Sequence, residues 1–224
     1  MAVARGLFVT GTDTGVGKTV VSAALMIRLR PAAPVRYWKP IQTGIEQDDD
    51  TATVTWLARC AAAELLTSGV RLRHPVSPHL AARLSGTTIN LPPLEDTFND
   101  ASRSARLIVE GAGGVLVPVN DLQFVSDLMA RLDLPTVIVA RSTLGTINHT
   151  LLTIEALRHR SLGIAGVVMV GPPSADNRHA IERYGGVRVL GEMPLFEETL
   201  SPEVLSAWAA TELDREHVLP EMLR

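Results

Sequence analysis

Hydrophobic residues in this chain gather in short continuous runs that alternate with longer segments of helical spacing. The apolar runs cover residues 7–10, 35–40, 107–109, 135–140, 164–170 and 187–190, and such runs are typical of strands buried on both faces of a parallel sheet. Helical segments are predicted at residues 20–30, 51–66, 125–132, 176–184 and 200–223, and a further helix follows the turn at residues 142–149 and runs to about residue 160. This alternation predicts roughly seven strand-helix pairs.

Successive strands of this kind are joined by right-handed crossovers, which place helices on both faces of a mostly parallel sheet. We interpret residues 71–86 as a loop that enters a short helix, and residues 193–196 as the loop beyond the last strand. Pro92 can open a further helix with Leu94 and Phe98 on its apolar face. Since no Ser/Gly-rich linker or charged block divides the sequence, we expect one α/β domain over residues 1–224.

Composition narrows the classes of function. The chain has 224 residues, a net charge of -3 and a pI near 6.1, so it lacks the basic surface that nucleic-acid binding requires. Cys60 is the only cysteine, which rules out an intrachain disulfide and favours a reducing compartment. Residues 1–9 are too short for a secretory signal, and no apolar run approaches the ~18 residues of a membrane span. We therefore expect a cytoplasmic enzyme that acts on small molecules, without nucleic-acid or membrane partners.

A glycine-rich stretch, Gly-Thr-Asp-Thr-Gly-Val-Gly-Lys-Thr at residues 11–19, joins the first predicted strand to the first predicted helix. Glycines there allow backbone N–H groups to approach phosphate oxygens at the start of the helix. Lys18 would reach the β- and γ-phosphates, and the Thr19 hydroxyl would take a position on Mg²⁺. The loop is one residue longer than the standard phosphate-binding loop (P-loop), but it ends in the same Gly-Lys-Thr. A glycine-rich turn with a solvated lysine is the disfavoured alternative, because a strand precedes the loop and a helix follows it.

Polar residues follow the second predicted strand, where ligands of an open parallel sheet gather. Lys39 ends that strand and Thr43 lies in the loop beyond it, although an ordinary surface lysine is equally compatible with the position. An acidic triplet at residues 48–50 then precedes a predicted helix. It suits a magnesium ion, which takes one or two carboxylates between phosphates. It suits helix capping equally well.

Two later stretches repeat this arrangement. Glu110 stands where the strand at residues 107–109 stops, before a glycine-rich turn, and a metal role there is favoured over hydrogen bonds to loop amides. The turn at residues 142–149 opens a helix whose free N–H groups, at Gly145 and beyond, can receive a carboxylate or phosphate. An ordinary capped helix is an equal alternative. We expect all these groups along one edge of the sheet.

Five stretches together resemble the dethiobiotin synthetase family. They are residues 11–19, Lys39-Pro-Ile-Gln-Thr-Gly44, Ser77-Pro-His-Leu-Ala-Ala82, Glu110-Gly-Ala-Gly-Gly114 and Leu144-Gly-Thr-Ile-Asn-His149. The match in order and spacing extends from near the first residue to Pro194. The resemblance implies a P-loop NTPase-like domain. It also implies a ligase of biotin biosynthesis that converts 7,8-diaminononanoate, CO₂ and ATP, with Mg²⁺, into the cyclic urea dethiobiotin through a carbamate and a carbamic-phosphoric anhydride.

The resemblance also implies roles for individual residues. Lys39 would be the catalytic lysine, with Lys18 neutralising phosphate charge, and Thr19, Asp50 and Glu110 would bind the metal. Nucleotide binding would fall to Thr14, Gly15, Val16, Gly17, Lys18, Thr19, Val20, Asp50, Glu110, Gly111, Ala112, Gly113, Gly171, Pro172, Pro194, Leu195 and Phe196. The diamine would contact Thr14, Lys39, Thr43, Gly145, Thr146, Ile147 and Asn148, the last four from the other subunit of a homodimer.

The chain departs from the family pattern in two places. Gly15 stands where some members have Glu, a change that keeps the loop backbone exposed. Residues 170–173, Val-Gly-Pro-Pro, replace a segment in which an adenine-reading Asn usually follows the strand. We therefore expect weaker discrimination of ATP from CTP or GTP.

Two other classes of protein compete with this interpretation. Dimeric nucleotide-switch ATPases of the partitioning kind use a similarly lengthened loop, but they usually carry a lysine early in it, where this chain has Thr12 and Asp13. A cobyrinate-type ligase would need a glutamine-handling domain, for which the chain offers no segment. Of these three classes, dethiobiotin synthetase is the one that the sequence resembles most.

Overall fold

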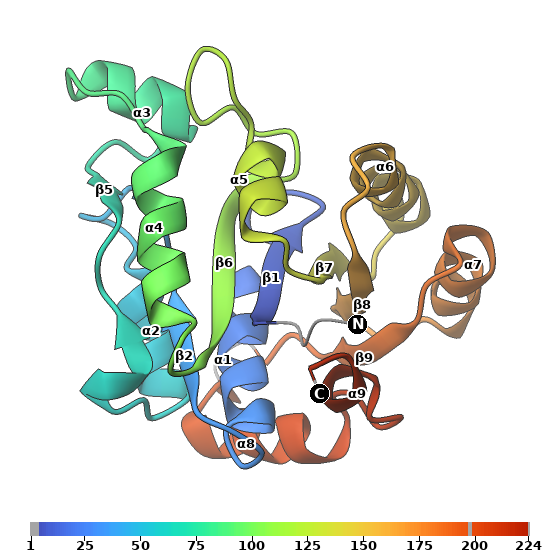
Figure 1. Cartoon of the computed structure of the whole chain (residues 1–224). Coiled ribbons are helices and arrows are strands. Elements are labelled where there is room, and N and C mark those ends of the chain that lie inside the picture. Colours follow the sequence, from blue (N-terminus) through green and yellow to red (C-terminus); the bar gives the residue numbers. More distant parts are fainter. Residues whose placement is uncertain (1–4, 197–198, 224) are drawn as a thin grey trace.

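A parallel sheet of seven strands runs through the centre of the computed structural model, which describes residues 5–196 and 199–223 (Figure 1). Its strands stand in the order β4-β2-β6-β1-β7-β8-β9. Their bounds are β1 (Gly6–Gly11), β2 (Val35–Trp38), β4 (Leu65–Leu66), β6 (Arg106–Gly114), β7 (Thr136–Arg141), β8 (Ile164–Val170) and β9 (Val189–Met193). The predicted α/β class, with a mostly parallel sheet, is confirmed.

Strand β1 lies between β6 and β7, at the point where the strand order reverses. The chain leaves β1 for β2 on one side of it, returns to β6 beside it, and continues through β7, β8 and β9 on the other side. Ligands of open α/β sheets bind beyond the carboxyl ends of the strands at such a reversal. The loop that follows β1 therefore occupies the favoured position.

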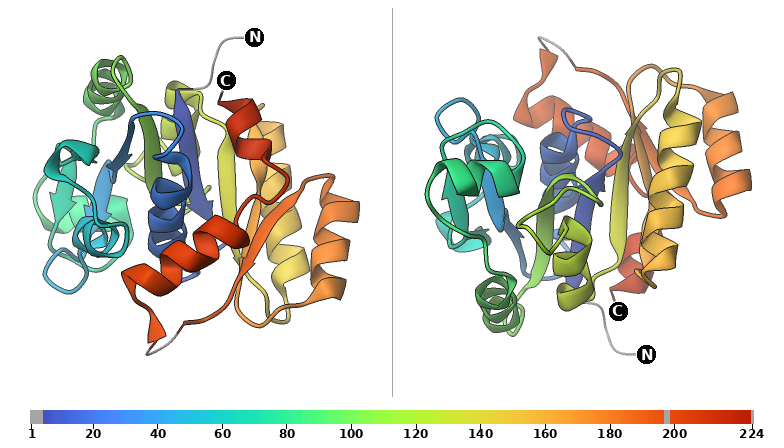
Figure 2. Two further views of the ribbon diagram at one scale, coloured as in Figure 1. Left: turned by 90° about the horizontal axis from the view of Figure 1, so that it is seen from below. Right: turned by 90° about the horizontal axis from the view of Figure 1, so that it is seen from above.

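Helices cover both faces of the sheet (Figure 2). Their buried side chains form two separate apolar layers, one on each face. One layer contains α1 (Lys18–Leu29), α2 (Asp50–Leu57), α8 (Pro202–Thr211) and α9 (Val218–Met222). The other contains α3 (Pro78–Leu84), α4 (Leu91–Ala101), α5 (Val125–Leu132), α6 (Thr146–His159) and α7 (Ala175–Gly185). Leu7 and Val9 of β1 face the first layer and Phe8 faces the second, because strand side chains alternate with a period of two. Continuous apolar runs follow from burial on both faces.

The segment after α2 departs from the expected helix over residues 51–66, and that expectation was wrong. Helix α2 ends at Leu57, Arg59 adopts a positive φ of 48°, and a short 3₁₀ turn, η1 (Ala62–Glu64), leads into β4. Leu65 and Leu66 then pair with Tyr37 and Trp38 of β2. The open edge of β2 offers these residues hydrogen bonds that outweigh their helical preference.

A second, two-stranded sheet was not foreseen. Strand β3 (Ile41–Thr43) pairs in parallel with β5 (Val70–Leu72), beside the carboxyl end of β2. Both strands have only three residues, too few for a periodic pattern to reveal them. Their pairing fixes the path of the chain between Lys39 and α2.

Two further boundaries correct the sequence analysis. Strand β6 does not stop at Glu110 but continues through Gly114, which pairs with Gly11 of β1. Position 111 in this extension requires glycine, because a Cβ there would lie 2.8 Å from the Phe8 ring and clash with it. The expected helix over residues 200–223 is also two helices, α8 and α9, separated by Asp214 and His217 at positive φ. The Asp214 carboxylate accepts the N–H groups of Val218 and Leu219 at 2.8 and 3.1 Å and starts the second helix.

Candidate functional site

The phosphate-binding loop connects β1 to α1 at the carboxyl edge of the sheet. Gly15 and Gly17 adopt positive φ values of 68° and 96°, and Gly17 precedes a helix start that has no side-chain cap. A Cβ on Gly11 would lie 2.7 Å from the Asp13 carbonyl and 3.1 Å from the Lys18 ammonium, so no larger residue fits there. The uncapped N–H groups and the tight loop form a ready site for a phosphate.

Lys18 folds back over this loop. It is buried, and its ammonium donates to the Asp13 carbonyl at 3.1 Å. Burial and the nearby Lys39 lower its pKa, while Glu110 and Asp50 oppose that shift. Within the described part of the chain, the ammonium of Lys18 has no carboxylate in direct contact, because Glu110, Asp50 and Asp13 act on it only through their charges. A triphosphate in the loop would supply a closer negative charge.

The three residues expected to bind a metal meet in the structure. The Thr19 hydroxyl lies 2.8 Å from Asp50 Oδ1 and 3.0 Å from Glu110 Oε1, although Thr19 lies in the first turn of α1, Asp50 begins α2 and Glu110 belongs to β6. Two residues of the acidic triplet have different roles. Asp49 caps α2 by accepting the Ala52 N–H at 3.0 Å, whereas Asp50 contacts the Thr19 hydroxyl. Both alternatives predicted for the triplet, helix capping and a place in the candidate metal site, thus apply, each to a different carboxylate.

Lys39 sits between the same two carboxylates. Its ammonium lies 2.6 Å from Asp50 Oδ2, 2.8 Å from Glu110 Oε1 and 3.1 Å from the Gly111 carbonyl, and its side chain is almost fully buried. Burial lowers the pKa of Lys39, but Glu110 and Asp50 raise it by more, so the net shift is upward. Burial likewise raises the pKa of Asp50, yet Lys39 and Thr19 bring it below its usual value. The surface-lysine alternative is excluded, and both shifts favour the charged forms of Lys39 and Asp50 at neutral pH.

Two residues of the site escaped sequence reasoning. The Tyr37 hydroxyl donates to Glu110 Oε2 at 2.9 Å, and burial followed by the charge on Glu110 raises its pKa well above the usual value. The signal was its place two residues before Lys39, on the same face of a strand. Arg141 ends β7, pairs with Asp13 at 3.0 Å and donates to the Thr14 carbonyl at 3.0 Å. Its position at a strand tip was the available clue.

Asp13 lies at the outer side of the loop. The N–H of Thr14, at 2.7 Å, and the Arg141 guanidinium lower the pKa of the Asp13 carboxyl. Asp13 therefore remains charged and holds Arg141 beside the loop. These contacts connect the tip of β7 to the backbone of the phosphate-binding loop at residues 13–14.

A cavity of about 360 Å³ adjoins the loop and joins it to the later strand tips. Eight residues expected to bind nucleotide line it: Gly15, Val16, Gly17, Val20, Gly171, Pro194, Leu195 and Phe196. Arg141 and Thr143 also line it, and its walls are otherwise largely apolar. Gly171 has a φ of 133°, and a Cβ there would lie 2.4 Å from Ser142 Oγ, so this position has room for no side chain. The largely apolar lining suits a nucleotide base.

The residues expected to hold the diamine are spread over several elements. Thr43 ends β3, and Thr14 lies exposed in the loop, where its backbone contacts Asp13 and Arg141. Gly145 precedes α6 with a φ of 95° and no side-chain cap, and Asn148 is exposed in the first turn of that helix. Within residues 5–196 and 199–223, no hydrogen bond joins the start of α6 to Thr43 or to Lys39. The structure thus brings together the residues expected to bind a metal and many of those expected to bind nucleotide, but not all of those expected to bind the diamine.

The donor set of the Thr19 cluster suits a hard divalent cation. Its atoms are oxygens, and it offers two carboxylates and one hydroxyl beside a phosphate-binding loop, which is the environment that magnesium takes with nucleotides. In the part of the chain that the structure describes, no three His, Cys, Asp or Glu side chains gather closely enough to hold a metal by themselves. A cation here would therefore rely on phosphate oxygens and water for its remaining ligands.

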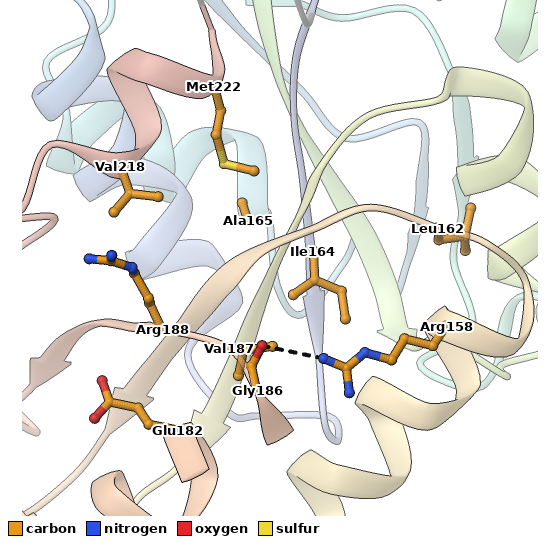
Figure 3. A pocket seen from close by; sticks show the side chains of 10 residues that line it. All are labelled: Arg158, Leu162, Ile164, Ala165, Glu182, Gly186, Val187, Arg188, Val218 and Met222. Carbon is orange, nitrogen blue, oxygen red and sulfur yellow. Dashed lines mark hydrogen bonds between the residues drawn. The ribbon is translucent and has the colours of Figure 1, made fainter. Parts of the chain in front are cut away.

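A larger cavity, of about 520 Å³, lies at the opposite edge of the sheet, beside the starts of β8 and β9 (Figure 3). Its charged side chains already have partners: Arg158 donates to the carbonyls of Gly185 and Gly186 at 2.6 and 3.3 Å, and Arg188 pairs with Glu216. These contacts close the end of α7 and fix α9. The groups that sequence reasoning singled out lie elsewhere.

Comparison with known proteins gives the family. A family model described as an AAA domain matches residues 5–203. The ATP-dependent dethiobiotin synthetase BioD of Paramagnetospirillum magneticum is 52% identical over 189 residues, which cover 84% of this chain and 87% of that protein. The chain belongs to the dethiobiotin synthetase family. A second family member, BioD of Agrobacterium fabrum, is 44% identical over 201 residues and covers 88% of this chain and 89% of that protein.

Solved structures support the fold. The ParA family ATPase from Chlorobium tepidum superposes with a TM-score of 0.57 at 13% identity, over 99% of this chain and 98% of that one. The cell division ATPase MinD of Pyrococcus furiosus gives 0.54 at 16% identity, over 88% of this chain and 87% of that one. Likeness at this identity shows a shared P-loop fold alone, whereas sequence identity places the chain with the synthetases. None of the described helices combines the length and hydrophobicity needed to span a membrane.

The Arg141 contacts generate a test. Replacing Arg141 with Ala removes two hydrogen bonds that hold residues 13–14, and we expect the Kd for nucleotide, measured by calorimetry, to rise about 2- to 5-fold, since exposed ion pairs contribute modestly. Arg131→Ala serves as the control, because it breaks a comparable exposed pair with Glu95 far from the loop. Equal affinities for the two variants would show that Arg141 does not organise the loop.

Proposed function

We propose that this chain is a Mg²⁺-dependent dethiobiotin synthetase that closes 7,8-diaminononanoate and CO₂ to a cyclic urea at the expense of ATP. The observation that carries the proposal is the buried cluster of Lys39, Asp50 and Glu110 beside the phosphate-binding loop. Its sequence relatives are named ATP-dependent dethiobiotin synthetases. We infer further that residues 1–224 work as one domain in the cytoplasm.

The reaction asks the protein for positioning and neutralisation of charge more than for covalent chemistry. A substrate amine first takes up CO₂ as a carbamate and loses a proton. A carbamate oxygen then attacks the γ-phosphorus of ATP and displaces ADP. The second amine attacks the carbonyl carbon, loses a proton and displaces phosphate to close the ring. Each step before ring closure gathers negative charge near the γ-phosphate. Cationic groups fixed at that place lower the barrier because they need not reorganise during the reaction.

Lys18 and Lys39 are the cations available for this purpose. Lys18 would move from the Asp13 carbonyl to the triphosphate, and Lys39 would face the carbamate and the γ-phosphate. The raised pKa of Lys39 keeps its amine protonated, so it acts as a fixed positive charge rather than as a base. Thr19, Asp50 and Glu110 would hold Mg²⁺, which when bound supplies further positive charge to the phosphate oxygens.

The substrate carboxylate is assigned to the start of α6 in a partner subunit. This 14-residue helix begins at Thr146 without a side-chain cap. The Thr146 N–H donates to the Thr143 carbonyl at 3.1 Å, which leaves the N–H groups of Ile147 and Asn148 to bind an anion. Leu144, in the turn before it, is fully exposed, so its side chain is available for an apolar contact with a second subunit. A homodimer that covers this turn would complete the site with residues 145–148.

A reaction assay tests the activity. With diaminononanoate, bicarbonate, Mg²⁺ and ATP, phosphate release should require the diamine, and Lys39→Ala should lower turnover about 100-fold or more because it removes a charge matched to the transition state. Arg73→Ala is the control, as it breaks only an exposed pair with Glu46. Circular dichroism would confirm that both variants are folded. Phosphate release at the same rate with and without the diamine would favour a nucleotide-switch ATPase instead.

Base selectivity gives a second test. The cavity offers apolar walls and a Gly171 without a side chain, and such a surface separates bases weakly because it presents few specific hydrogen-bonding groups. We expect kcat/KM values for ATP, CTP and GTP within about 10-fold of one another. A preference for ATP above about 100-fold would mean that backbone groups of the cavity read adenine specifically.

The dimer proposal has its own variant. Leu144→Asp should raise the dimer Kd at least about tenfold in sedimentation, because it replaces an apolar contact with a charge, and should raise the KM for the diamine. Val204→Asp, on α8 at the other face of the sheet, should leave both values near those of the unaltered protein. An unchanged dimer with an unchanged KM in Leu144→Asp would exclude this turn from the interface.

A further inference from the structure

Glu110 is the most enclosed member of the site, and both of its carboxylate oxygens have donors. Oε1 lies within hydrogen-bond distance of Thr19 and Lys39, whereas Oε2 accepts from the Tyr37 hydroxyl at 2.9 Å. Glu110 has no exposed surface. A buried carboxylate needs donors on both oxygens, because water cannot supply them. Tyr37 thus satisfies the side of Glu110 that faces away from the phosphate-binding loop.

The sheet explains how Tyr37 reaches this carboxylate. Strands β2 and β6 are neighbours, and Tyr37 stands opposite Ile108 in their register. Glu110 lies two residues beyond Ile108, on the same face of the sheet as Tyr37. The tyrosine ring is fully buried in the apolar layer that contains α1 and α2. Its ring position is therefore set by the packing of the core, and its hydroxyl is a fixed donor.

We propose that Tyr37 is a positioning residue that holds the Glu110 carboxylate in the orientation required to bind Mg²⁺. The inference rests on the metal role proposed above for Glu110. Tyr37 does not touch substrate or metal; it acts through Glu110, leaving Oε1 toward Thr19 and the phosphates. Without the hydroxyl, Oε2 would lack a donor in a dry environment, and the carboxylate would turn away to find another.

The test compares three variants in full-length protein. Tyr37→Phe removes only the hydroxyl and keeps the ring in the core, Glu110→Gln removes the proposed ligand charge, and Tyr184→Phe removes the hydroxyl of the other, exposed tyrosine. The readouts are the Kd of Mn²⁺ measured by electron paramagnetic resonance with nucleotide present, the Kd of nucleotide in EDTA, and the Mg²⁺ dependence of turnover.

For Tyr37→Phe we expect the Mn²⁺ Kd and the Mg²⁺ concentration for half-maximal turnover to rise about 10-fold, as losses of groups that orient metal ligands typically do. The Kd of nucleotide in EDTA should not change, and saturating Mg²⁺ should restore most of kcat. Tyr184→Phe should match the unaltered protein. An unchanged Mn²⁺ Kd in Tyr37→Phe, or an equal loss of nucleotide affinity in EDTA, would overturn the proposal.

Glu110→Gln distinguishes a failure of the positioning role of Tyr37 from a failure of the metal role of Glu110. If it weakens Mn²⁺ binding while Tyr37→Phe does not, the positioning role alone fails; if neither weakens it, the metal role of Glu110 fails as well. Should Tyr37→Phe not fold, Tyr184→Phe labelled with 3-fluorotyrosine carries a single ¹⁹F reporter, at Tyr37. Addition of Mg²⁺ with nucleotide should shift that resonance, and an unmoved resonance would contradict the coupling.

Discussion

The site depends on the burial of one ammonium between two carboxylates. Lys39 lies within 2.8 Å of both Asp50 and Glu110, in a position that water barely reaches. Removing charges from water costs several kcal/mol per ion, and that cost is offset only when each charge has close partners. Loss of one member would leave the others uncompensated. This constraint holds β2, β6 and the start of α2 in fixed relative positions, and it leaves the neighbouring Thr19 hydroxyl against the same carboxylates.

Around this cluster, the parallel sheet brings distant parts of the chain to one edge. Because every strand of the central sheet runs in the same direction, the residues that follow β1, β2, β7, β8 and β9 all emerge on the same side. The loop after β1 offers free N–H groups, and the segments after β8 and β9 form the cavity beside it. The candidate sites for phosphate, base and cation are thus adjacent, although most of the segments that contribute to them are far apart in sequence.

Sequence reasoning was least reliable where pairing between strands decided the structure. Leu65 and Leu66 were expected in a helix, yet the free edge of β2 draws them into the sheet. Glu110 was expected at a strand tip, but pairing with β1 carries β6 on through Gly114, so the carboxylate reaches the site from within the strand. Tyr37 was passed over as a core residue because an apolar run gives no sign of a partner for a hydroxyl. Each error concerns a contact between segments far apart along the chain.

The sequence by itself determined the α/β class, the phosphate-binding loop, and the strand tips at which polar residues gather, because these follow from local periodicity and from glycines in a short span. It also supplied the family resemblance, which sequence comparison confirmed. The family resemblance favoured Asp50 within the acidic triplet, but only the tertiary structure showed that Asp50 contacts Lys39 while Asp49 caps α2, and that Tyr37 and Arg141 join the site. Those assignments depend on strand register and on the direction of side chains. Neither can be predicted from a local sequence pattern, because both are set by packing across the sheet.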